Sequence, residues 1–327
     1  MLMINEKQIQ QLYKMSDAME DIRTILKAKE QEKIANPHRT VIEFPEREAS
    51  ALYMPSADLA GDVAGVKVVT IFPENPAQGK PTTQGMILLT DAANGEHVAM
   101  MAASYLTRLR TGALSGIATD LLAKKESRVL VVIGTGAMAF EQVLGVLAVR
   151  PIEKIILVNR TPAKAQAFGE KLNDFGVKIS WEVENNVAKA VKKADIICCA
   201  TRSNEPVFDG ADLQPGTHIN GVGSYLPRMR EVDEATVARA DKIVVDDLAG
   251  VKGEAGELIH SAKNGTWSFE QVYGTLSELT VANRHARQSD EEVTFFKSVG
   301  TAYFDLAVAK GVYAKALLIG AGVNVEM

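Results

Sequence analysis

Short apolar runs alternate with longer helical patterns between residues 128 and 245. The apolar runs predict strands at 129–133, 155–158, 178–183, 196–201, 218–222 and 243–245. Apolar strands that alternate with helices are typical of a parallel sheet with helices on both faces. The pattern therefore predicts an α/β class with a doubly wound parallel sheet for this part of the chain.

The first 115 residues follow a different pattern. An amphipathic helix is predicted at 18–29, then short strand patterns interrupted by prolines, and then a helix at 102–109. A last helical pattern at 301–318 is expected to fold back onto this region. We therefore predict a mixed α+β domain from residues 1–115 with 301–327, and a central domain at 116–300.

A glycine turn lies between the first two strands of the central domain. Gly134-Thr-Gly136 follows the apolar run 129–133, and Ala139 occupies the third small position of the turn. Glycines at these positions let the backbone approach a pyrophosphate, which then lies at a helix N-terminus. We predict a Rossmann-type dinucleotide site here; a tight turn that binds no ligand is the alternative.

The end of the second strand bears on which dinucleotide is bound. An acidic residue there would accept hydrogen bonds from a ribose 2′-hydroxyl, whereas a cation would bind a 2′-phosphate. This chain has Asn159-Arg160-Thr161 at that position, with Lys164 one turn further on. The donors predict NADPH in preference to NADH; the alternative is that Arg160 points into solvent.

Composition restricts the class of protein. A hydrophobic content of 46% with 24% charged residues is typical of globular proteins, and 327 residues suffice for two domains. The net charge of −5 argues against a nucleic-acid partner, and neither a secretory signal nor a membrane-length apolar run is found. Cys198 and Cys199 are interpreted as small apolar residues on opposite faces of a strand, and we expect no metal site and a cytoplasmic location.

Three cations of the first domain are candidates for a substrate site: Arg39, Lys67 and Arg110. Lys67 lies in an otherwise apolar, strand-like run, where a buried lysine is costly unless it faces an anion or a cleft. Taken singly, each cation is more simply interpreted as a solvated surface charge. Glu254 and Glu257 are likewise interpreted as charged surface, with an approach to the cleft as the alternative.

Several segments together resemble a known family. They are Gly65-Val-Lys67, Arg108-Leu-Arg110-Thr111, Gly134-Thr-Gly136, Ile219-Asn-Gly-Val-Gly223 and Phe296-Lys-Ser-Val-Gly300. In this order they resemble the ornithine cyclodeaminase/mu-crystallin family of dinucleotide-dependent enzymes over nearly the whole chain. The resemblance implies a homodimer in which residues 1–115 with 301–327 form the substrate-binding and dimerisation domain, and 116–300 form the dinucleotide-binding Rossmann domain.

The resemblance also implies roles for individual residues. Arg39, Lys67 and Arg110 would surround the carboxylate of an amino or imino acid, with Lys67 as the proton donor. The residues expected to contact the cofactor are Thr82, Thr83, Arg110, Thr111, Gly134, Thr135, Gly136, Ala137, Met138, Asn159, Arg160, Thr161, Lys164, Thr201, Val222, Gly223 and Ser298. We expect the basic residues of the first domain to face the nicotinamide ring held by the central domain.

One departure from the family pattern separates possible reactions. Cyclodeaminases of the family carry an Asp shortly after the Asn-x-Val-Gly motif, where this chain has Tyr225 and no acid before Glu231. A carboxylate is needed to move the protons of the amine and water during cyclodeamination. We therefore predict an NADPH-dependent reductase of a cyclic ketimine carboxylate, of the pyrroline- or piperideine-2-carboxylate type. An ornithine cyclodeaminase-type lyase using NAD, an alanine dehydrogenase-like enzyme, and a ligand-binding protein with vestigial activity are the alternatives.

Overall fold

The computed structural model describes residues 1–282 and 286–326. The chain divides into two compact units, Met1–Arg110 with Thr301–Met327, and Thr111–Gly300. The sequence predicts boundaries after residues 115 and 300, so the first boundary falls earlier than predicted. Helix α3 (Ala103–Leu122), which is predicted to end at residue 109, continues across this boundary.

The first unit contains a mixed sheet with the strand order β16-β1-β7-β6-β5-β4-β2, and β3 also pairs with β4. The β1–β7 pair is parallel, whereas the pairs that run from β7 to β3 are antiparallel. The strands are β1 (Leu2–Ile4), β2 (Ile34–Ala35), β3 (Thr40–Phe44), β4 (Ala49–Asp58), β5 (Val63–Ile71), β6 (Thr83–Asp91), β7 (His97–Ala102) and β16 (Val323–Asn324).

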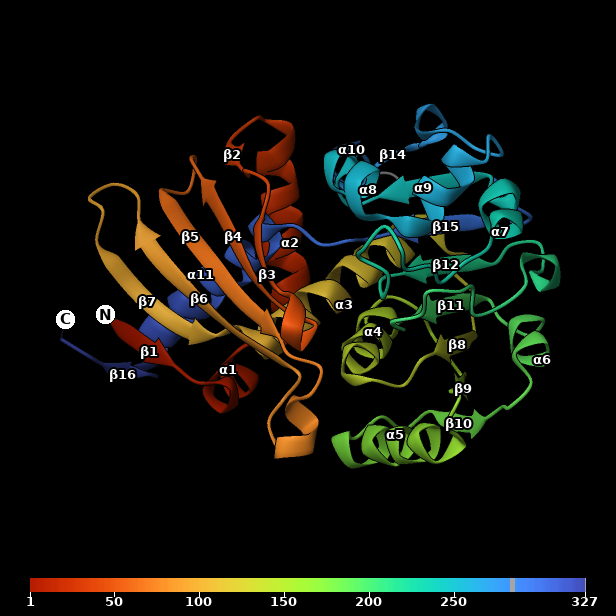
Figure 1. Cartoon of the computed structure of the whole chain (residues 1–327), viewed down its shortest axis with the longest axis horizontal. Coiled ribbons are helices and arrows are strands. Elements are labelled where there is room, and N and C mark those ends of the chain that lie inside the picture. The colour runs from red at the N-terminus through yellow and green to blue at the C-terminus, as the bar shows by residue number, and fades with distance from the viewer. Residues whose placement is uncertain (283–285, 327) are drawn as a thin grey trace. The chain divides into compact units, whose positions relative to one another are not determined.

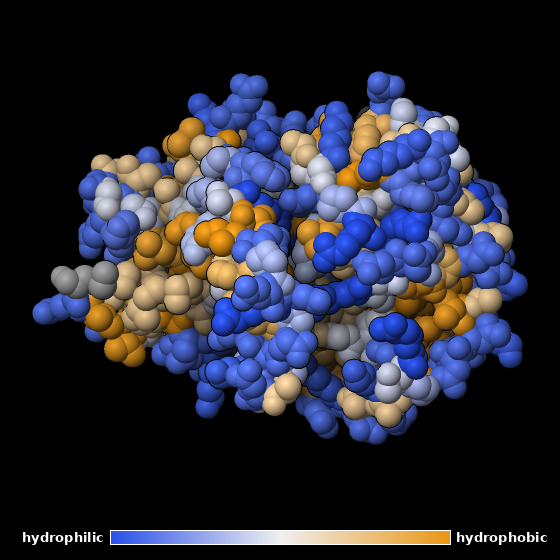
Figure 2. Space-filling model, viewed as in Figure 1, coloured by the Kyte–Doolittle hydropathy of each residue, from blue (hydrophilic) through white to orange (hydrophobic). Residues whose placement is uncertain are grey.

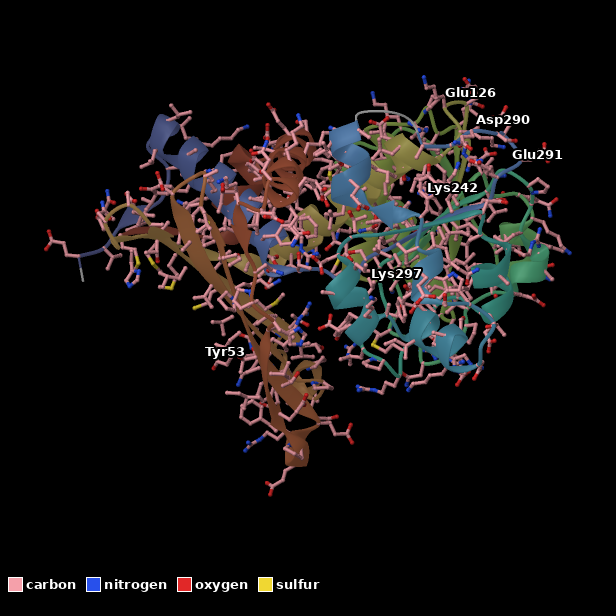
Figure 3. The ribbon with its side chains drawn as sticks, turned by 90° about the horizontal axis from the view of Figure 1, so that it is seen from above. Tyr53, Glu126, Lys242, Asp290, Glu291 and Lys297 are labelled. Atoms are coloured by element: carbon pink, nitrogen blue, oxygen red, sulfur yellow. The ribbon has the colours of Figure 1, made fainter. Side chains whose placement is uncertain are left out.

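Helices α2 (Met15–Glu30) and α11 (Ala302–Ile319) lie on one face of this sheet (Figures 1 and 3). Both correspond to predicted helices, and α11 does pack on the sheet of the first unit, as expected. The buried residues of α2 are Ala18, Met19, Ile22, Ile25 and Leu26, the spacing of one apolar helix face. Helix α1 (Glu6–Leu12) was not predicted from the sequence, and two short 3-10 helices span Pro45–Arg47 and Asn75–Gln78.

The opposite face of the same sheet is apolar but is not covered by these helices. Cross-strand pairing places Tyr53, Val68 and Met86 in one row, and Pro55, Val66, Leu88 and Met100 in the next. Tyr53 is 39% exposed and Met86 48% exposed. Tyr53 lies on the side of the sheet away from α2 and α11 (Figure 3), and apolar side chains are visible on this face in Figure 2.

The second unit contains a parallel sheet with the strand order β10-β9-β8-β11-β12-β15-β13-β14. Its strands are β8 (Val129–Ile133), β9 (Lys154–Val158), β10 (Ser180–Val183), β11 (Ile196–Cys199), β12 (His218–Gly221), β13 (Lys242–Val245), β14 (Gly274–Thr275) and β15 (Thr294–Lys297). The strand order reverses between β8 and β11, which is the position where doubly wound sheets bind nucleotides. The predicted Rossmann-type class is confirmed.

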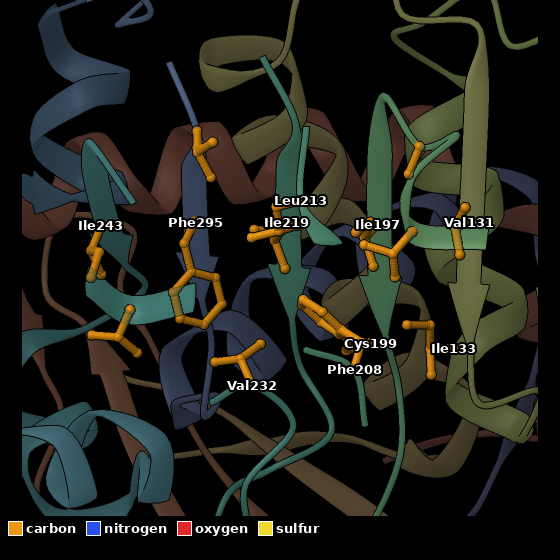
Figure 4. Packing of buried hydrophobic residues seen from close by; sticks show 14 of the residues in the cluster. Val131, Ile133, Ile197, Cys199, Phe208, Leu213, Ile219, Val232, Ile243 and Phe295 are labelled. Carbon is orange, nitrogen blue, oxygen red and sulfur yellow. The ribbon is translucent and has the colours of Figure 1, made fainter. Parts of the chain in front are cut away.

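Helices cover both faces of this sheet (Figure 1). They are α4 (Ala137–Leu147), α5 (Pro162–Phe175), α6 (Val187–Val191), α7 (Glu234–Arg239), α8 (Leu248–Glu254), α9 (Gly256–Lys263) and α10 (Leu276–Ala282), with 3-10 helices at Gly210–Asp212 and Phe269–Gln271. Alternate strand residues enter two separate cores, one of which is shown in Figure 4. Cys198 lies in one core and Cys199 in the other, both fully buried and unpaired, which agrees with their interpretation as apolar strand residues.

Two features of the second unit were missed in the sequence. Strand β15 has a polar residue at each end, Thr294 and Lys297, yet all four of its residues are buried between β12 and β13. Helix α3 contains Gly112 and Gly116, which lower helix propensity. A Cβ on Gly112 would lie 2.2 Å from the Glu141 carbonyl oxygen, so the glycines are required by close packing against α4.

None of the helices formed by the described residues combines the length and apolarity needed to cross a bilayer.

Candidate functional site

The first unit holds a buried cluster of two cations and one carboxylate. Lys67 lies at the centre of β5 on the face that α11 covers, and only 3% of it is exposed. Its Nζ donates to Oδ2 of Asp305 on α11 at 2.6 Å, and Arg110 Nε donates to Oδ1 of the same carboxylate at 3.2 Å. The interpretation of Lys67 and Arg110 as solvated surface charges is therefore wrong, because a single buried acid holds both.

Burial controls the protonation of this cluster. Removal from water lowers the pKa of Lys67 to about 8; the Asp305 charge opposes this shift, and the Arg110 and Arg39 charges add to it. Burial alone would raise the pKa of Asp305, but the charges of Arg110 and Lys67 outweigh burial and lower it. Burial is therefore the larger cause of the lowered pKa of Lys67, and the neighbouring cations contribute less.

Asp305 is the residue that sequence reasoning missed. It is the first charged residue of an otherwise apolar helical stretch, Ala302-Tyr-Phe-Asp-Leu-Ala-Val-Ala309. A lone acid in such a stretch is a signal, because charged side chains are rarely buried without a partner. Its partners lie 238 and 195 residues away in the chain, so their identity could not be read from the local pattern.

The remaining predicted residues of the first unit lie at different distances from this cluster. Arg39 is half-buried and close enough to affect the pKa of Lys67. Thr82 and Thr83 lie at the start of β6, and Thr83 pairs with Ile71, four residues along β5 from Lys67. The structure thus brings Arg39, Lys67 and Arg110 together, whereas the two threonines lie toward the end of the β5–β6 hairpin.

In the second unit the glycine turn follows β8, as predicted. Gly134 has φ +88°, and a Cβ there would lie 2.6 Å from Thr201 Cγ2, so the fold itself requires this glycine. Gly136 precedes α4, and a Cβ there would meet no described atom within 4 Å. Packing within the described chain therefore does not require Gly136, whereas the close approach of a phosphate to the N-terminus of the eleven-residue helix α4 would require it.

Other residues predicted to contact the cofactor lie in α4, in α3 and directly after β9. Ala137 and Met138 form the first turn of α4, and Thr111 is buried in α3. Asn159 Nδ2 donates to Thr135 Oγ1 at 2.6 Å, which links the glycine turn to the end of β9.

Three donors lie exposed beyond Asn159. Arg160 follows the end of β9, Thr161 is the N-cap of α5, and Lys164 lies in the first turn of that helix. A helix N-terminus flanked by a guanidinium, a hydroxyl and an ammonium is a suitable site for a phosphate group.

The loops that follow β11, β12 and β15 contain the last predicted cofactor residues. The backbone N–H and the hydroxyl of Thr201 both donate to Glu231, and the backbone N–H of Gly223 donates to it as well. Val222 is buried beside Gly223. Ser298 follows β15, and its hydroxyl donates to Asp246 at 2.7 Å. These four residues therefore lie at the carboxyl ends of the strands, where Rossmann-type sheets bind their ligands.

The structure also bears on the missing Asp of cyclodeaminases. Tyr225 stands at that position, and Glu231 is the next acid in the chain. The Glu231 carboxylate is fully buried and accepts hydrogen bonds from two adjacent loops. A carboxylate with this set of bonds is not free to exchange protons with a substrate, so Glu231 does not replace the Asp.

A parallel sheet with a glycine turn at its switch point, in the same chain as a buried cationic cluster, defines a protein of the dinucleotide-binding fold class. The chain belongs to the ornithine cyclodeaminase/mu-crystallin family, whose model matches residues 1–318. The resemblance inferred from the sequence motifs is thereby confirmed.

Individual relatives match over the whole length of the chain. A Delta(1)-pyrroline-2-carboxylate reductase of Bacillus cereus is 38% identical over 326 residues, with 100% of each chain covered. The structure of the Thermococcus litoralis Delta(1)-pyrroline-2-carboxylate reductase in complex with NADH and L-proline matches with a TM-score of 0.95 at 36% identity, covering 99% of this chain and 100% of that chain. An archaeal alanine dehydrogenase dimer with bound NAD matches with a TM-score of 0.92 at 33% identity, covering 99% and 98%.

Proposed function

We propose that this protein reduces a cyclic ketimine carboxylate of the pyrroline-2-carboxylate type to the corresponding amino acid, with a nicotinamide dinucleotide as the reductant. The buried Lys67–Asp305–Arg110 cluster carries the proposal. With Lys67 protonated, this cluster holds one net positive charge. Excess buried positive charge is unfavourable unless an anion compensates it, and a substrate carboxylate is such an anion. The family and the named reductases support this class of substrate.

Arg110 is suited to bind the substrate carboxylate. Among the described residues, its guanidinium makes one hydrogen bond, from Nε to Asp305. The two terminal nitrogens can therefore donate to a carboxylate in paired geometry. Asp305 fixes the Nε edge of the guanidinium and so sets the direction in which the other two nitrogens point.

Lys67 supplies the proton for the imine nitrogen. One of its three N–H groups donates to Asp305, and no other described residue accepts from it, which leaves two N–H groups for the substrate. With a pKa near 8 the ammonium is a stronger acid than an ordinary lysine, yet it is mostly protonated at neutral pH. The N–H bond of the ammonium breaks as the proton reaches the ring nitrogen, while a hydride adds to the ring carbon of the C=N bond.

The second unit would hold the cofactor. Gly134, Gly136 and the N-terminus of α4 would bind the pyrophosphate, and the loops containing Thr201, Gly223 and Ser298 would bind the nicotinamide half. When bound, the reduced nicotinamide would supply the hydride. The chain would position this ring, and the imine itself needs no further activation beyond protonation.

The test of the reaction uses one substitution and a substrate panel. Lys67→Met should reduce turnover of pyrroline-2-carboxylate or piperideine-2-carboxylate by roughly a hundredfold or more, the upper range for a general acid, because the proton donor is lost. Nucleotide affinity should stay within about twofold, since Lys67 is not among the residues expected to contact the cofactor. Unchanged turnover in Lys67→Met would refute the role of this lysine. Ammonia released from ornithine without net nucleotide oxidation would instead identify a lyase. Ammonia-dependent oxidation of NADPH or NADH with pyruvate would identify an alanine dehydrogenase.

NADPH is the preferred cofactor in this proposal. The exposed Arg160, Thr161 and Lys164 at the N-terminus of α5 suit a 2′-phosphate, and no acid follows β9 at residues 159–161 to bind a free 2′-hydroxyl. The solved relatives contain NADH and NAD, so cofactor preference is a point on which this chain is expected to differ from them.

Measuring kcat/KM with both nucleotides tests this preference. Arg160→Ala should lower kcat/KM for NADPH about tenfold or more and leave the value for NADH within about twofold, because only the phosphate loses a charged partner. Arg128→Ala is the matched control, since Arg128 is an exposed arginine directly before β8, at the opposite end of that strand from the glycine turn. A higher kcat/KM for NADH than for NADPH in the unmodified protein would contradict the preference.

A homodimer formed through the open face of the first unit's sheet is also proposed. The rows that contain Tyr53, Val68 and Met86 expose apolar side chains, and exposed apolar patches of this kind mark protein interfaces. The matching archaeal alanine dehydrogenase is a dimer, which supports a second copy as the partner. The double substitution Tyr53→Asp/Met86→Asp should give a monomer in light scattering, whereas Phe175→Asp, at an exposed apolar position of α5, should not. An unmodified protein that is monomeric at micromolar concentration would exclude this dimer.

A further inference from the structure

A buried carboxylate joins two loops of the second unit that follow neighbouring strands. Oε1 of Glu231 accepts from the backbone N–H of Thr201 at 2.6 Å and from its hydroxyl at 2.8 Å. Oε2 accepts from the backbone N–H of Gly223 at 2.6 Å and from that of Ser224 at 3.3 Å. Each oxygen of one carboxylate therefore holds one loop: Oε1 the loop after β11, and Oε2 the loop after β12.

A second set of buried groups lies behind this carboxylate. Lys297, at the end of β15, is fully buried; its Nζ donates to the carbonyl oxygen of Ser224 at 2.6 Å and lies 3.1 Å from Glu257 Oε1 (Figure 3 marks Lys297). The Ser224 hydroxyl lies 2.8 and 2.9 Å from the two oxygens of Glu257. The sequence-based interpretation of Glu257 as charged surface is wrong, because Glu257 is the buried counter-ion of Lys297.

The two loops approach each other so closely that the residue types are restricted. A Cβ on Gly223 would lie 2.0 Å from the carbonyl oxygen of Thr201 and 2.5 Å from Glu231 Oε1. A Cβ on Gly134 would lie 2.6 Å from Thr201 Cγ2. The Thr201 loop is thus fixed between the glycine turn on one side and the Gly223 loop on the other, and Glu231 supplies the hydrogen bonds that hold it there.

The stability of the sheet does not by itself account for Glu231, because burying a carboxylate is unfavourable. The four hydrogen bonds that this carboxylate accepts from two loops therefore call for another explanation. Strands β11 and β12 are already paired along their length, and the Glu231 bonds begin where that pairing ends. The bonds therefore order the segments that project from the carboxyl ends of the strands, where a Rossmann-type sheet binds its ligand.

We propose that Glu231 is a positioning residue that fixes the Thr201 and Gly223 loops in the arrangement that binds the nicotinamide half of the cofactor. This inference rests on the proposed function, because it assumes a nicotinamide dinucleotide. Glu231 itself does not touch the cofactor in this account. It acts through the two loops, whereas the glycine turn and the end of β9 bind the adenosine half independently of it.

The test separates the two halves of the nucleotide by binding rather than by turnover. Affinities are measured by calorimetry for NADH against ADP-ribose, and for NADPH against 2′-phospho-ADP-ribose, so that the result does not depend on which cofactor is preferred. In Glu231→Gln one oxygen of the carboxylate is replaced by an NH₂ group, which cannot accept a hydrogen bond, so one loop loses its acceptor. The Kd of the complete dinucleotide should rise about tenfold or more, and that of the ADP-ribose ligand should stay within about twofold.

Asp195 is the matched control, because its carboxylate also accepts backbone hydrogen bonds but lies at the amino ends of the strands. Asp195 Oδ2 accepts from the backbone N–H groups of Arg128 and Val129, at 2.8 and 3.0 Å, where β8 begins. Asp195→Asn should lower the melting temperature without changing the ratio of the two affinities. Glu231→Asp keeps the charge but shortens the side chain. The Kd of the complete dinucleotide should therefore rise less than in Glu231→Gln, again with little change for the ADP-ribose ligand. This variant tests the proposal if Glu231→Gln does not fold.

The outcomes separate this inference from the proposed function. Equal weakening of both ligands in Glu231→Gln would show a general structural role and overturn the positioning role alone. Equal affinity of the unmodified protein for the dinucleotide and its ADP-ribose part would show that the two loops contribute no nicotinamide contact. That result would also overturn the positioning role alone. An unmodified protein that binds none of the four ligands would overturn the inference and the proposed function together.

Discussion

Asp305 is expected to set the pH range in which the reductase works, because it is the anion that keeps Lys67 protonated. The substitution Asp305→Asn retains the size of the side chain and removes its charge. Burial and the charges of Arg110 and Arg39 then act on Lys67 with no carboxylate to oppose them. The pKa of Lys67 should fall below about 8, and the protonated form should be lost at a lower pH.

The magnitude follows from the geometry. An opposite charge at close contact shifts a pKa by about one to three pH units, and Lys67 Nζ lies 2.6 Å from Asp305 Oδ2. Taking the middle of that range, the pKa in the variant would be about 6, within the range documented for buried lysines. At pH 7.5 the protonated fraction of Lys67 would fall from about three quarters to about 3%, a loss of roughly 25-fold in kcat/KM if Lys67 is the proton donor.

The assay is the pH dependence of kcat/KM for the cyclic imine between pH 5 and 9, because kcat/KM reports the ionisation of the free enzyme. The basic limb of the profile should lie near pH 8 in the unmodified protein and near pH 6 in Asp305→Asn, so activity should recover as the pH is lowered. Asp58→Asn is the control, because Asp58 also pairs with a lysine of α11, Lys310, at 3.1 Å. Its basic limb should not move. A limb set by ionisation of the free substrate would lie at the same pH in all three proteins, so a shift in Asp305→Asn alone excludes that explanation. A loss of the same size at every pH in Asp305→Asn would refute the reasoning.

Further predictions concern the second unit. Gly136→Val should weaken binding of both nucleotides about tenfold or more with little change in melting temperature, because a Cβ there meets no described protein atom. Gly134→Ala should instead lower the melting temperature, because Gly134 has a positive φ and no room for a Cβ. The opposite pattern would contradict these assignments. Neither Cys198 nor Cys199 should react with a thiol reagent until the protein unfolds, since burial raises the pKa of Cys198 to about 12 and that of Cys199 well above its usual range; rapid labelling of the folded protein would contradict this. Gly112→Ala should destabilise the protein by about 1 to 3 kcal/mol in urea unfolding, because its Cβ would overlap the Glu141 carbonyl oxygen, and an unchanged midpoint would show that α3 and α4 can separate.

The strands and the nucleotide turn of the second unit could be predicted from the sequence because their signals are local. A strand buried on both faces needs a continuous apolar run, and a turn that approaches a phosphate needs glycine. Residues 129–133 followed by Gly134 and Gly136 satisfy both conditions within eight positions. Strand β15 was missed because its ends are Thr294 and Lys297, whose burial depends on partners far away in the chain, Leu122 and Glu257.

By itself the sequence determined the class of fold, the position of the nucleotide turn and the set of candidate cations, since each depends on residue type and short spacing. Only the tertiary structure decided which charges are buried together. Asp305 with Lys67, Glu231 with Thr201 and Gly223, and Glu257 with Lys297 are pairings between separate elements of the fold. Burial of a charge is tolerated where a partner in three dimensions compensates it, and a linear pattern of hydrophobic and polar residues carries no information on that partner.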